Sequence, residues 1–371
     1  MNVGGPAVLL GDLIEGLNPF EFEHTLLTGV CRANEIDYLE SHPLTGKAIY
    51  LPEVQRSVLP IKDIKGLFAM IAILRKIKPD VVHTHTSKAG VLGRIATRLA
   101  APKAKVVHTY HGHVLYGYFP KFMTYLIIIL ERSLAKITDV LVAITSQVED
   151  DLRSVRIGNS HQWRMIRLGI KIESLRNRAE ARYALNIRSE EMTFLWIGRF
   201  AAIKNPIFAL EAFKEFCGNN PRNYRLIMVG DGELKEDAEQ FASDAKLQVD
   251  FVGWSNDVYK YLPAADILLL TSVNEGMGMV ILEAATQNVP TLATNVGGVT
   301  EFIKDGETGF LSSLNVHEYA IKMKEIVSAP DLLSRTGKSA RALVESEFSR
   351  ELFVKNHVDL YRELYRPIKS A

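Results

Sequence analysis

Residues 267–285 read ILLLTSVNEGMGMVILEAA, and this stretch decides the fold class. Its first four residues form a short apolar run typical of a buried strand, a glycine-containing turn follows, and an apolar helical pattern begins near Gly278. A strand that leads through a tight turn into a helix is half of a β-α-β unit. The first turn of such a helix presents unpaired N–H groups at the carboxyl end of the strand, which makes it a natural phosphate site.

The same alternation of strand and helix continues along the chain in both directions. Short apolar, β-branched runs predict strands at 24–29, 81–85, 106–110, 140–144, 193–197, 225–229, 249–251, 267–270 and 291–293. Amphipathic patterns between them predict helices, for example at 64–77, 121–135, 206–217 and 235–245. We therefore expect an α/β protein with two Rossmann-like domains built on parallel sheets, at 1–168 and 169–345, and a final helical segment at 346–371.

The first domain departs from this pattern at its start. The chain begins MNVGGPA, directly on a glycine loop, where a doubly wound domain should open with a buried strand. The sequence therefore predicts that the first strand is missing, as a late start codon or a truncation would explain. A missing central strand would destabilise the domain, and activity without it is an open question.

Composition limits the class of protein. The chain has 371 residues and only two cysteines, Cys31 and Cys217, far apart and without a CxxC pattern. A disulfide framework and a structural zinc site are therefore not expected. The start lacks the features of a signal peptide, and the most apolar run, YLIIIL at 125–130, is far short of a membrane span. We expect a cytoplasmic protein.

Basic residues are concentrated in one part of the first half. Between residues 56 and 136 there are 14 Lys and Arg against 3 Asp and Glu. Such a surplus attracts a membrane surface, a diphosphate or a nucleic acid, although a solvated basic face would give the same counts. No recognised nucleic-acid-binding motif accompanies the charge, so nucleic acid is not an expected partner.

Four charged residues of the second half could act on a diphosphate. Glu275 lies in the turn of the quoted stretch and Glu283 one to two turns into its helix, so two carboxylates flank the phosphate site, where they could bind sugar hydroxyls. Arg199 and Lys204 lie in the loop GRFAAIKN, which follows another expected strand. A forked cation and a point cation suit a leaving diphosphate. These residues could also have no binding role. The two glutamates could be a helix cap and a surface side chain, and the two cations could be solvated surface residues.

Five of the ten histidines lie in two short strings, at positions 83, 85, 108, 111 and 113. Alternation along a strand places His83 and His85 on one face, an arrangement that could hold a metal ion. No Asp, Glu or Cys stands beside them, so His83, His85 and His108 are more simply interpreted as hydrogen-bonded core or rim histidines.

The order of motifs resembles the family 4 retaining glycosyltransferases, which have the GT-B fold. The motifs of the second half are GRF-x3-KNP at 198–206, VGDGE at 229–233, FVGW at 251–254, the Glu-x7-Glu pair, NVGG at 295–298 and DGETG at 305–309. In the first half, residues 2–7 resemble the glycine loop of the family. HTHTSKAG at 83–90 and HTYHGH at 108–113 resemble a subgroup that builds surface polysaccharides on lipid carriers.

The resemblance implies a role for each candidate site residue. Glu275 would bind donor-sugar hydroxyls, His111 would sit at the donor sugar near the reacting centre, and Arg199 and Lys204 would neutralise the leaving diphosphate. Glu283 would hold the ribose hydroxyls. The other donor-binding residues would contribute mainly backbone: Gly4, Gly5, Gly253, Gly276, Met277, Gly278 and Met279.

The resemblance also implies an architecture and an activity. The two sheets would face each other across a cleft. Residues 1–168 would take the acceptor, residues 169–345 the nucleotide-sugar, and segment 346–371 would pack back toward the first domain. A hexosyl group would pass with retention from a nucleotide diphosphate-sugar, with UDP the commonest base, in capsule, exopolysaccharide or O-antigen synthesis. No D-x-D sequence occurs, so neither a metal ion nor another cofactor is expected.

The expected partners are a polyprenyl-diphosphate-linked sugar acceptor and the anionic inner face of the plasma membrane, to which the protein would bind peripherally. A nucleotide-sugar 2-epimerase on the same fold and a non-catalytic sugar-nucleotide binder remain open alternatives. Two departures from the family concern single residues. Thr271 stands where proline is common, which we expect to matter little, and Lys171 replaces the usual Asp of an interdomain N-G-I-D.

Overall fold

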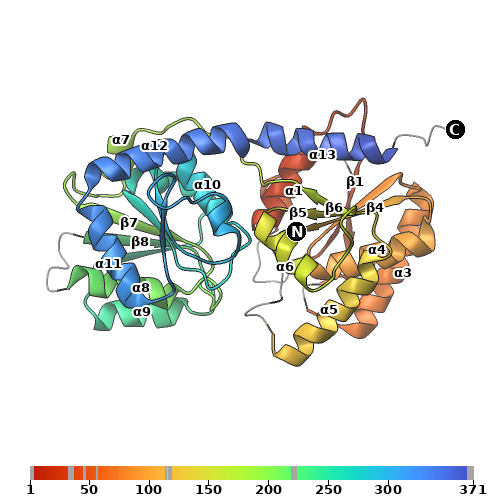
Figure 1. The fold of residues 1–371 in the computed structure, drawn as a ribbon, viewed down its shortest axis with the longest axis horizontal. Helices are drawn as coiled ribbons and strands as arrows, with labels where there is room; N and C mark the ends of the chain where they lie inside the picture. The colour runs from red at the N-terminus through yellow and green to blue at the C-terminus, as the bar shows by residue number, and fades with distance from the viewer. Residues whose placement is uncertain are drawn as a thin grey trace. The chain divides into compact units, whose positions relative to one another are not determined.

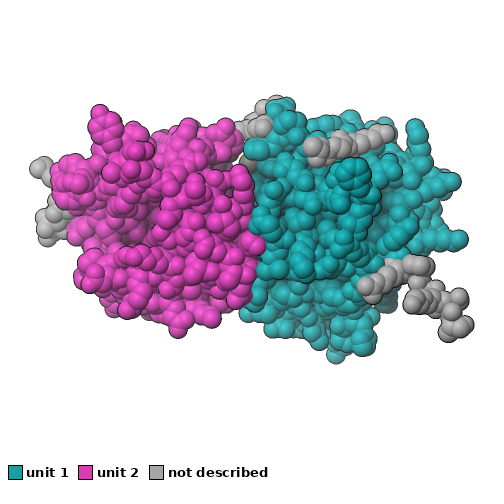
Figure 2. Space-filling view, turned by 90° about the horizontal axis from the view of Figure 1, so that it is seen from above, with its two compact units in different colours: residues 1–169, 350–371 teal, residues 170–349 magenta. Residues whose placement is uncertain are grey.

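The computed structural model describes residues 4–31, 37–44, 47–55, 57–112, 115, 119–218 and 224–365. The chain divides into two compact units, which Figure 2 colours separately: residues 1–169 together with 350–371, and residues 170–349. The last helix, α13 (Arg350–Tyr365), belongs to the first unit and packs against α1 (Gly5–Gly16) (Figure 1). The first unit is therefore built from both ends of the chain.

The first unit alternates strands and helices. Besides α1 and α13, its described elements are β1 (Thr25–Gly29), α2 (Tyr38–Ser41), β2 (Lys47–Leu51), α3 (Pro60–Ile77), β3 (Val81–His85), α4 (Ser87–Ala100), β4 (Lys105–Tyr110), α5 (Lys121–Ala135), β5 (Val140–Ala143), α6 (Ser146–Ser154) and β6 (Trp163–Met165). All strand pairs that these elements form are parallel.

The strands of the first unit fall into two sheets. Among the described residues, β1 pairs only with β2, whereas β3, β4, β5 and β6 form a four-stranded sheet in that order. In a doubly wound sheet of order 3-2-1-4-5-6, the first strand separates two such groups. Among the described residues, the split between the two sheets falls where that order places its first strand.

Helices cover the four-stranded sheet on both faces. The chain passes from β2 to β3, β4 and β5 in one direction, through α3, α4 and α5. Right-handed crossovers in one direction place their helices on the same face of a sheet, so these three helices share a face. In agreement, α4 packs against both α3 and α5, while α13 contacts β3 and packs with α1 (Figure 1). Among the described residues, no helix is both long and apolar enough to cross a bilayer.

The second unit is a complete doubly wound domain. Its helices and strands are α7 (Arg178–Ala184), β7 (Met192–Ile197), α8 (Pro206–Cys217), β8 (Tyr224–Val229), α9 (Lys235–Asp244), β9 (Val249–Gly253), β10 (Ile267–Leu270), α10 (Met279–Thr286), β11 (Thr291–Thr294), β12 (Phe310–Ser312), α11 (Val316–Val327) and α12 (Pro330–Glu347). Short 3-10 helices lie at Val258–Lys260, Leu262–Ala264 and Gly297–Glu301. The six strands form one parallel sheet in the order β12-β11-β10-β7-β8-β9.

Apolar clusters fix helices against strands and against one another in each unit. In the second unit, one large cluster joins β7 and β8 to α8 and α11 through side chains such as Phe194, Phe213 and Tyr319. In the first unit, one of the described clusters joins α3 to α4 through Met70 and Leu92.

Three strands escaped the sequence analysis: β2, β6 and β12. All three lie at an edge of their sheet. An edge strand is only partly buried and carries polar residues, so it lacks the apolar run by which buried strands are found in a sequence.

Candidate active site

The turn between β10 and α10 holds Glu275 in place through its backbone. Gly298 N donates to the carbonyl oxygen of Glu275 at 2.9 Å, and a Cβ added to Gly297 would lie 2.0 Å from that oxygen. Gly297 also has φ +53°, so both space and conformation require glycine there. Gly278, with φ +90°, caps α10 without any side-chain hydrogen bond, and the first N–H groups of the helix have no side-chain cap.

The carboxylate of Glu275 binds two neighbours. It forms an ion pair with Lys204 Nζ and accepts a hydrogen bond of 3.0 Å from Ser272 Oγ. The side chains of Glu275 and Lys204 are 13% and 28% exposed, so the pair is only partly screened by water. The structure thus brings together two of the predicted site residues, Glu275 and Lys204, beside the N-terminus of α10.

Thr271 joins the Lys204 loop to the end of β10. Its side chain is fully buried, accepts a hydrogen bond of 3.0 Å from Trp196 Nε1, and lies within donating distance of the carbonyl oxygens of Lys204 (3.0 Å) and Asn205 (3.1 Å). We expected the replacement of proline at this position to matter little. The hydroxyl instead makes contacts that a proline ring could not make.

Glu283 lies one turn into α10, on a mostly buried side of the helix. Burial raises the pKa of its carboxyl group to about 7. Within the described residues, no ion pair of this carboxylate is found. A partly buried, unpaired carboxyl group is suited to accept hydrogen bonds from hydroxyls of a ligand.

Three further residues of the second unit, Arg199, Gly253 and Trp254, lie nearer the surface. Arg199 is exposed in the loop after β7. Gly253, with φ +80°, ends β9, and its carbonyl oxygen accepts a hydrogen bond of 2.8 Å from Gly230 N. Trp254 beyond it is 42% exposed. Lys171 forms a surface ion pair with Glu173.

In the first unit, Gly4 and Gly5 stand at the start of α1. Gly4 is exposed and extended, and its carbonyl oxygen accepts hydrogen bonds from Ala7 N at 2.9 Å and Val8 N at 3.2 Å. The glycine loop thus leads directly into a helix N-terminus, which is the arrangement of a dinucleotide-type phosphate loop.

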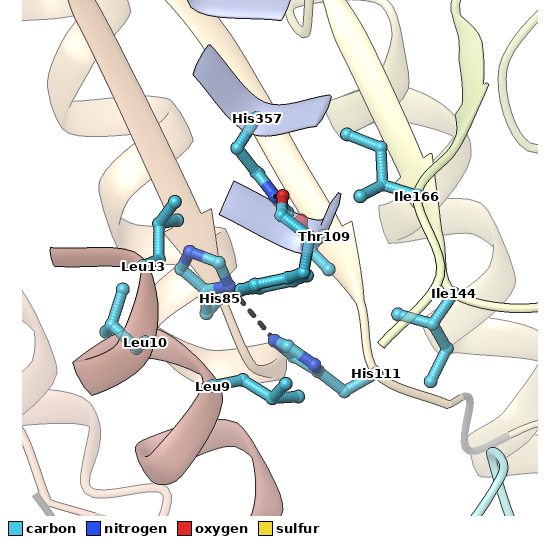
Figure 3. A pocket seen from close by; sticks show the side chains of 10 residues that line it. Leu9, Leu10, Leu13, His85, Thr109, His111, Ile144, Ile166 and His357 are labelled. Carbon is cyan, nitrogen blue, oxygen red and sulfur yellow. Dashed lines mark hydrogen bonds between the residues drawn. The ribbon is translucent and has the colours of Figure 1, made fainter. Parts of the chain in front are cut away.

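His111 follows β4 and lies in a cluster of histidines (Figure 3). Its Nε2 atom is 3.0 Å from Nδ1 of His85, which ends the neighbouring strand β3. Burial, with a smaller contribution from His357 on α13, lowers the pKa of His111 to about 4. The imidazole of His111 is therefore neutral near pH 7.

These histidines line a small cavity in the first unit. Leu9, Leu10 and Leu13 of α1 close one side of it and His357 of α13 another, as Figure 3 shows. Three buried ring nitrogens at the cavity have no hydrogen-bond partner among the residues that the structure describes: His85 Nε2, His111 Nδ1 and His357 Nε2. In the described part of the chain, no group of His, Cys, Asp and Glu has an arrangement that could hold a metal ion.

The comparisons with known proteins agree with the motifs. Residues 3–174 match the family model for glycosyltransferase family 4, and residues 177–343 match that for glycosyl transferases group 1. The chain is 31% identical over 341 residues to UDP-Gal:alpha-D-GlcNAc-diphosphoundecaprenol alpha-1,3-galactosyltransferase from Escherichia coli, covering 88% of this chain and 87% of that protein. This chain belongs to glycosyltransferase family 4.

A further relative and two solved structures are similar to this glycosyltransferase. The putative glycosyltransferase EpsD from Bacillus subtilis is 26% identical over 307 residues, covering 78% of this chain and 80% of that protein. Sucrose-phosphate synthase from Thermosynechococcus elongatus has a TM-score of 0.85 at 23% identity, covering 98% of this chain and 94% of that one. HepE from Anabaena, in complex with UDP-glucose, has a TM-score of 0.81 at 19% identity, covering 97% and 96%. The GT-B fold is thereby confirmed.

The sequence analysis missed three residues that contact the candidate residues: Ser272, which binds Glu275 in the second unit, and His357 and Tyr361 of α13, which contact the histidines of the first unit. His357 and Tyr361 are four residues apart and so share one face of their helix, but this spacing alone is common in core helices. Only the fold brings α13 to β3.

Proposed function

We propose that this glycosyltransferase moves a hexosyl group from a UDP-sugar, with retention and without a metal ion, onto a sugar carried by a polyprenyl diphosphate. The observation that carries the proposal is the Lys204–Glu275 ion pair beside the uncapped N-terminus of α10. The Escherichia coli relative is named for UDP-galactose and a diphosphoundecaprenol acceptor, which supports this choice of donor and acceptor. Polysaccharide synthesis is the corresponding pathway class.

The ion pair offers a simple account of donor binding. A diphosphate that enters at the helix N-terminus competes with Glu275 for Lys204 and is further attracted by Arg199 and the N–H groups of α10. Glu275, released from Lys204 but still held by Ser272, then accepts hydrogen bonds from the sugar hydroxyls. The anionic leaving group is stabilised by fixed cations and dipoles, so no metal ion is needed for its charge.

The nucleotide would be held by the second unit. Glu283 binds the ribose hydroxyls through its otherwise unpaired carboxylate, and the segment at Gly253 and Trp254 borders the base. On the first unit, Gly4 and Gly5 approach the diphosphate, and His111 contacts the donor sugar. The acceptor binds to the first unit, whose basic surplus suits a lipid diphosphate.

The test is a transfer assay with UDP-galactose, UDP-glucose and UDP-N-acetylglucosamine in EDTA, with a synthetic polyprenyl-diphosphate-linked sugar as acceptor and nuclear magnetic resonance to assign the anomeric configuration of the product. We expect an α-linked product, and a loss of about 10²-fold or more in kcat for Lys204→Ala. The matched control Lys338→Ala, an exposed lysine of α12, should retain full activity. An inverted product, dependence on added metal, or isomerised donor without acceptor would contradict the proposal.

We also propose that the protein works while bound peripherally to the inner face of the plasma membrane. The outward sides of α3, α4 and α5, here called the apolar helical face, expose Ile61 (75%), Phe68 (65%), Leu99 (58%), Phe122 (72%) and Tyr125 (59%). Exposed apolar patches of this kind mark interaction surfaces.

The charge around the apolar helical face fits an anionic bilayer. Basic residues outnumber acidic ones there, and two of the three acids are already paired, Asp63 with Lys88 and Glu131 with Arg94. Apolar side chains that enter the headgroup region and lysines that contact anionic lipids act together in peripheral binding.

Flotation with vesicles of phosphatidylcholine and phosphatidylglycerol tests this binding. We expect binding that decreases severalfold in the double variant Phe122→Glu, Tyr125→Glu and that persists partly in high salt, because apolar insertion is not screened. Tyr183→Glu, an equally exposed aromatic residue on α7 of the second unit, is the control. Absence of binding to anionic vesicles at low salt would refute peripheral attachment without affecting the transfer reaction.

A further inference from the structure

The side chains that face α13 form a connected row behind His111. In β3, His83 and His85 point to the same side of the sheet, and their rings lie 4.2 Å apart. His85 in turn stacks with His111 at 5.2 Å between ring centres and contacts it through the hydrogen bond of 3.0 Å. His111 is thus the last of three successive rings.

The far end of the row is firmly held. His83 Nδ1 lies 2.6 Å from the hydroxyl of Tyr361, and its Nε2 lies 2.7 Å from the hydroxyl of Thr109 on β4. Both ring nitrogens of His83 are therefore occupied, one by α13 and one by the adjacent strand. A ring bound at both nitrogens cannot turn freely, so it supports the ring of His85 that stacks on it.

The bond between His85 and His111 also constrains protons. Two neutral imidazoles share one hydrogen bond only if one ring donates and the other accepts. If His85 donates from Nδ1, the proton of His111 is on Nδ1; if His111 donates from Nε2, its Nδ1 is bare. The tautomers of the two rings are therefore coupled. The Nδ1 atom of His111 has no partner within the described part of the chain and is the atom left for a ligand.

We propose that His85 is a positioning residue, which fixes the ring orientation and the tautomer of His111 and so sets which group His111 presents to the donor sugar. This inference rests on the proposed role of His111 at the donor sugar. It extends that role to residues with no direct contact to the donor: His85, supported by His83 and Tyr361. The carboxyl-terminal helix α13 thereby takes part in shaping the site of the first unit.

The test combines kinetics with the tautomer of His111. We compare His85→Ala, which removes the bond, with His85→Asn, whose side-chain amide can replace the Nδ1 position. For His85→Ala we expect kcat about tenfold lower with the donor KM little changed, and for His85→Asn a recovery of most of that loss. In spectra of 15N-histidine-labelled protein, His111 should show a single tautomer that becomes a mixture in His85→Ala.

Two controls separate positioning from folding. UDP affinity should be unchanged in both His85 variants, because neither Glu283 nor the other residues proposed to bind UDP contact His85. His108→Asn removes a buried histidine of β4 that faces α4 and binds Thr84 instead of His111, and it should lower thermal stability without lowering kcat.

The inference fails if His85→Ala leaves both the tautomer of His111 and kcat unchanged, or if His85→Asn is as inactive as His85→Ala. The activity of His111→Ala tests the proposed role of His111 separately. If His111→Ala transfers sugar as well as the unchanged protein does, His111 has no role at the donor, whatever its tautomer.

Discussion

At the scale of single residues, the candidate site depends on a few polar groups that are partly removed from water. Lys204 and Glu275 neutralise each other, whereas Glu283 forms no ion pair with any described residue, and burial raises its pKa to about 7. Donor binding should therefore weaken when the charge of Lys204 or Glu275 is removed, and it should depend on pH through the carboxyl group of Glu283.

We predict that UDP binding strengthens as the pH rises through 7. The raised pKa of Glu283 means that the carboxyl is protonated below about pH 7 in the free protein, and the carboxylate is the better acceptor for two ribose hydroxyls. Affinity should therefore fall by up to about tenfold for each pH unit below 7.

Calorimetric titration with UDP between pH 5.5 and 8.5 measures this dependence. Glu283→Gln should bind UDP more weakly at pH 8 and show a flat profile. Glu211→Gln, an exposed glutamate on α8, should keep the profile of the unchanged protein. An unchanged slope in Glu283→Gln would assign the dependence to another group.

At the scale of elements, the end of β10 and the loop after β7 are joined through the hydroxyl of Thr271. This contact positions the backbone at Lys204 relative to Glu275, which lies four residues beyond Thr271. It connects two loops that the sequence separates by about 70 residues.

We predict that Thr271→Val, which keeps the shape but loses the hydroxyl, destabilises the second unit by about 1–3 kcal/mol, because Trp196 Nε1 and two carbonyl groups lose a buried partner. Urea unfolding checks the stability, and kcat should fall because the Lys204 loop loosens. Thr336→Val, a buried threonine on α12, should leave kcat unchanged. If Thr271→Val matched the stability and kcat of the unchanged protein, the hydrogen bonds of the Thr271 hydroxyl would contribute neither to stability nor to catalysis.

At the scale of the whole molecule, the two units should respond to acid in different ways. In the first unit, burial lowers the pKa of five histidines: His83, His85, His108, His111 and His357. A histidine with a lowered folded pKa contributes stability above its unfolded value near 6.5 and loses it as the pH falls. In the second unit, Glu283 acts in the opposite sense, since its pKa is raised.

We predict that lowering the pH from 7 to 5 unfolds the first unit before the second. His357 alone, buried and with a pKa of about 4, loses about 2 kcal/mol of stabilisation at pH 5. In Trp163→Phe the fluorescence of Trp196 and Trp254 reports on the second unit, and the difference between this signal and that of the unchanged protein reports on Trp163 in the first. His161→Asn, an exposed histidine, should not shift the transition. Simultaneous unfolding of both units would contradict the prediction.

Many of the strands and site loops of this protein were predictable from its sequence, because local residue patterns determine them. Buried parallel strands are rich in apolar residues, so β4, β7, β8 and β10 could be placed almost to the residue. The turn with Glu275 and the cations of the loop after β7 also follow from short stretches of sequence.

The tertiary structure alone decided which distant side chains meet. Thr271 lies 75 residues from Trp196, and His83 lies 278 residues from Tyr361, so no periodicity within one element could pair them. The edge strands and the contact of α13 with β3 likewise depend on packing between elements. Hydrogen bonds between distant side chains form only when the completed fold brings the two residues into the right geometry. A strand, a turn or a helix instead follows from the conformational preferences of its own segment, which the sequence already contains.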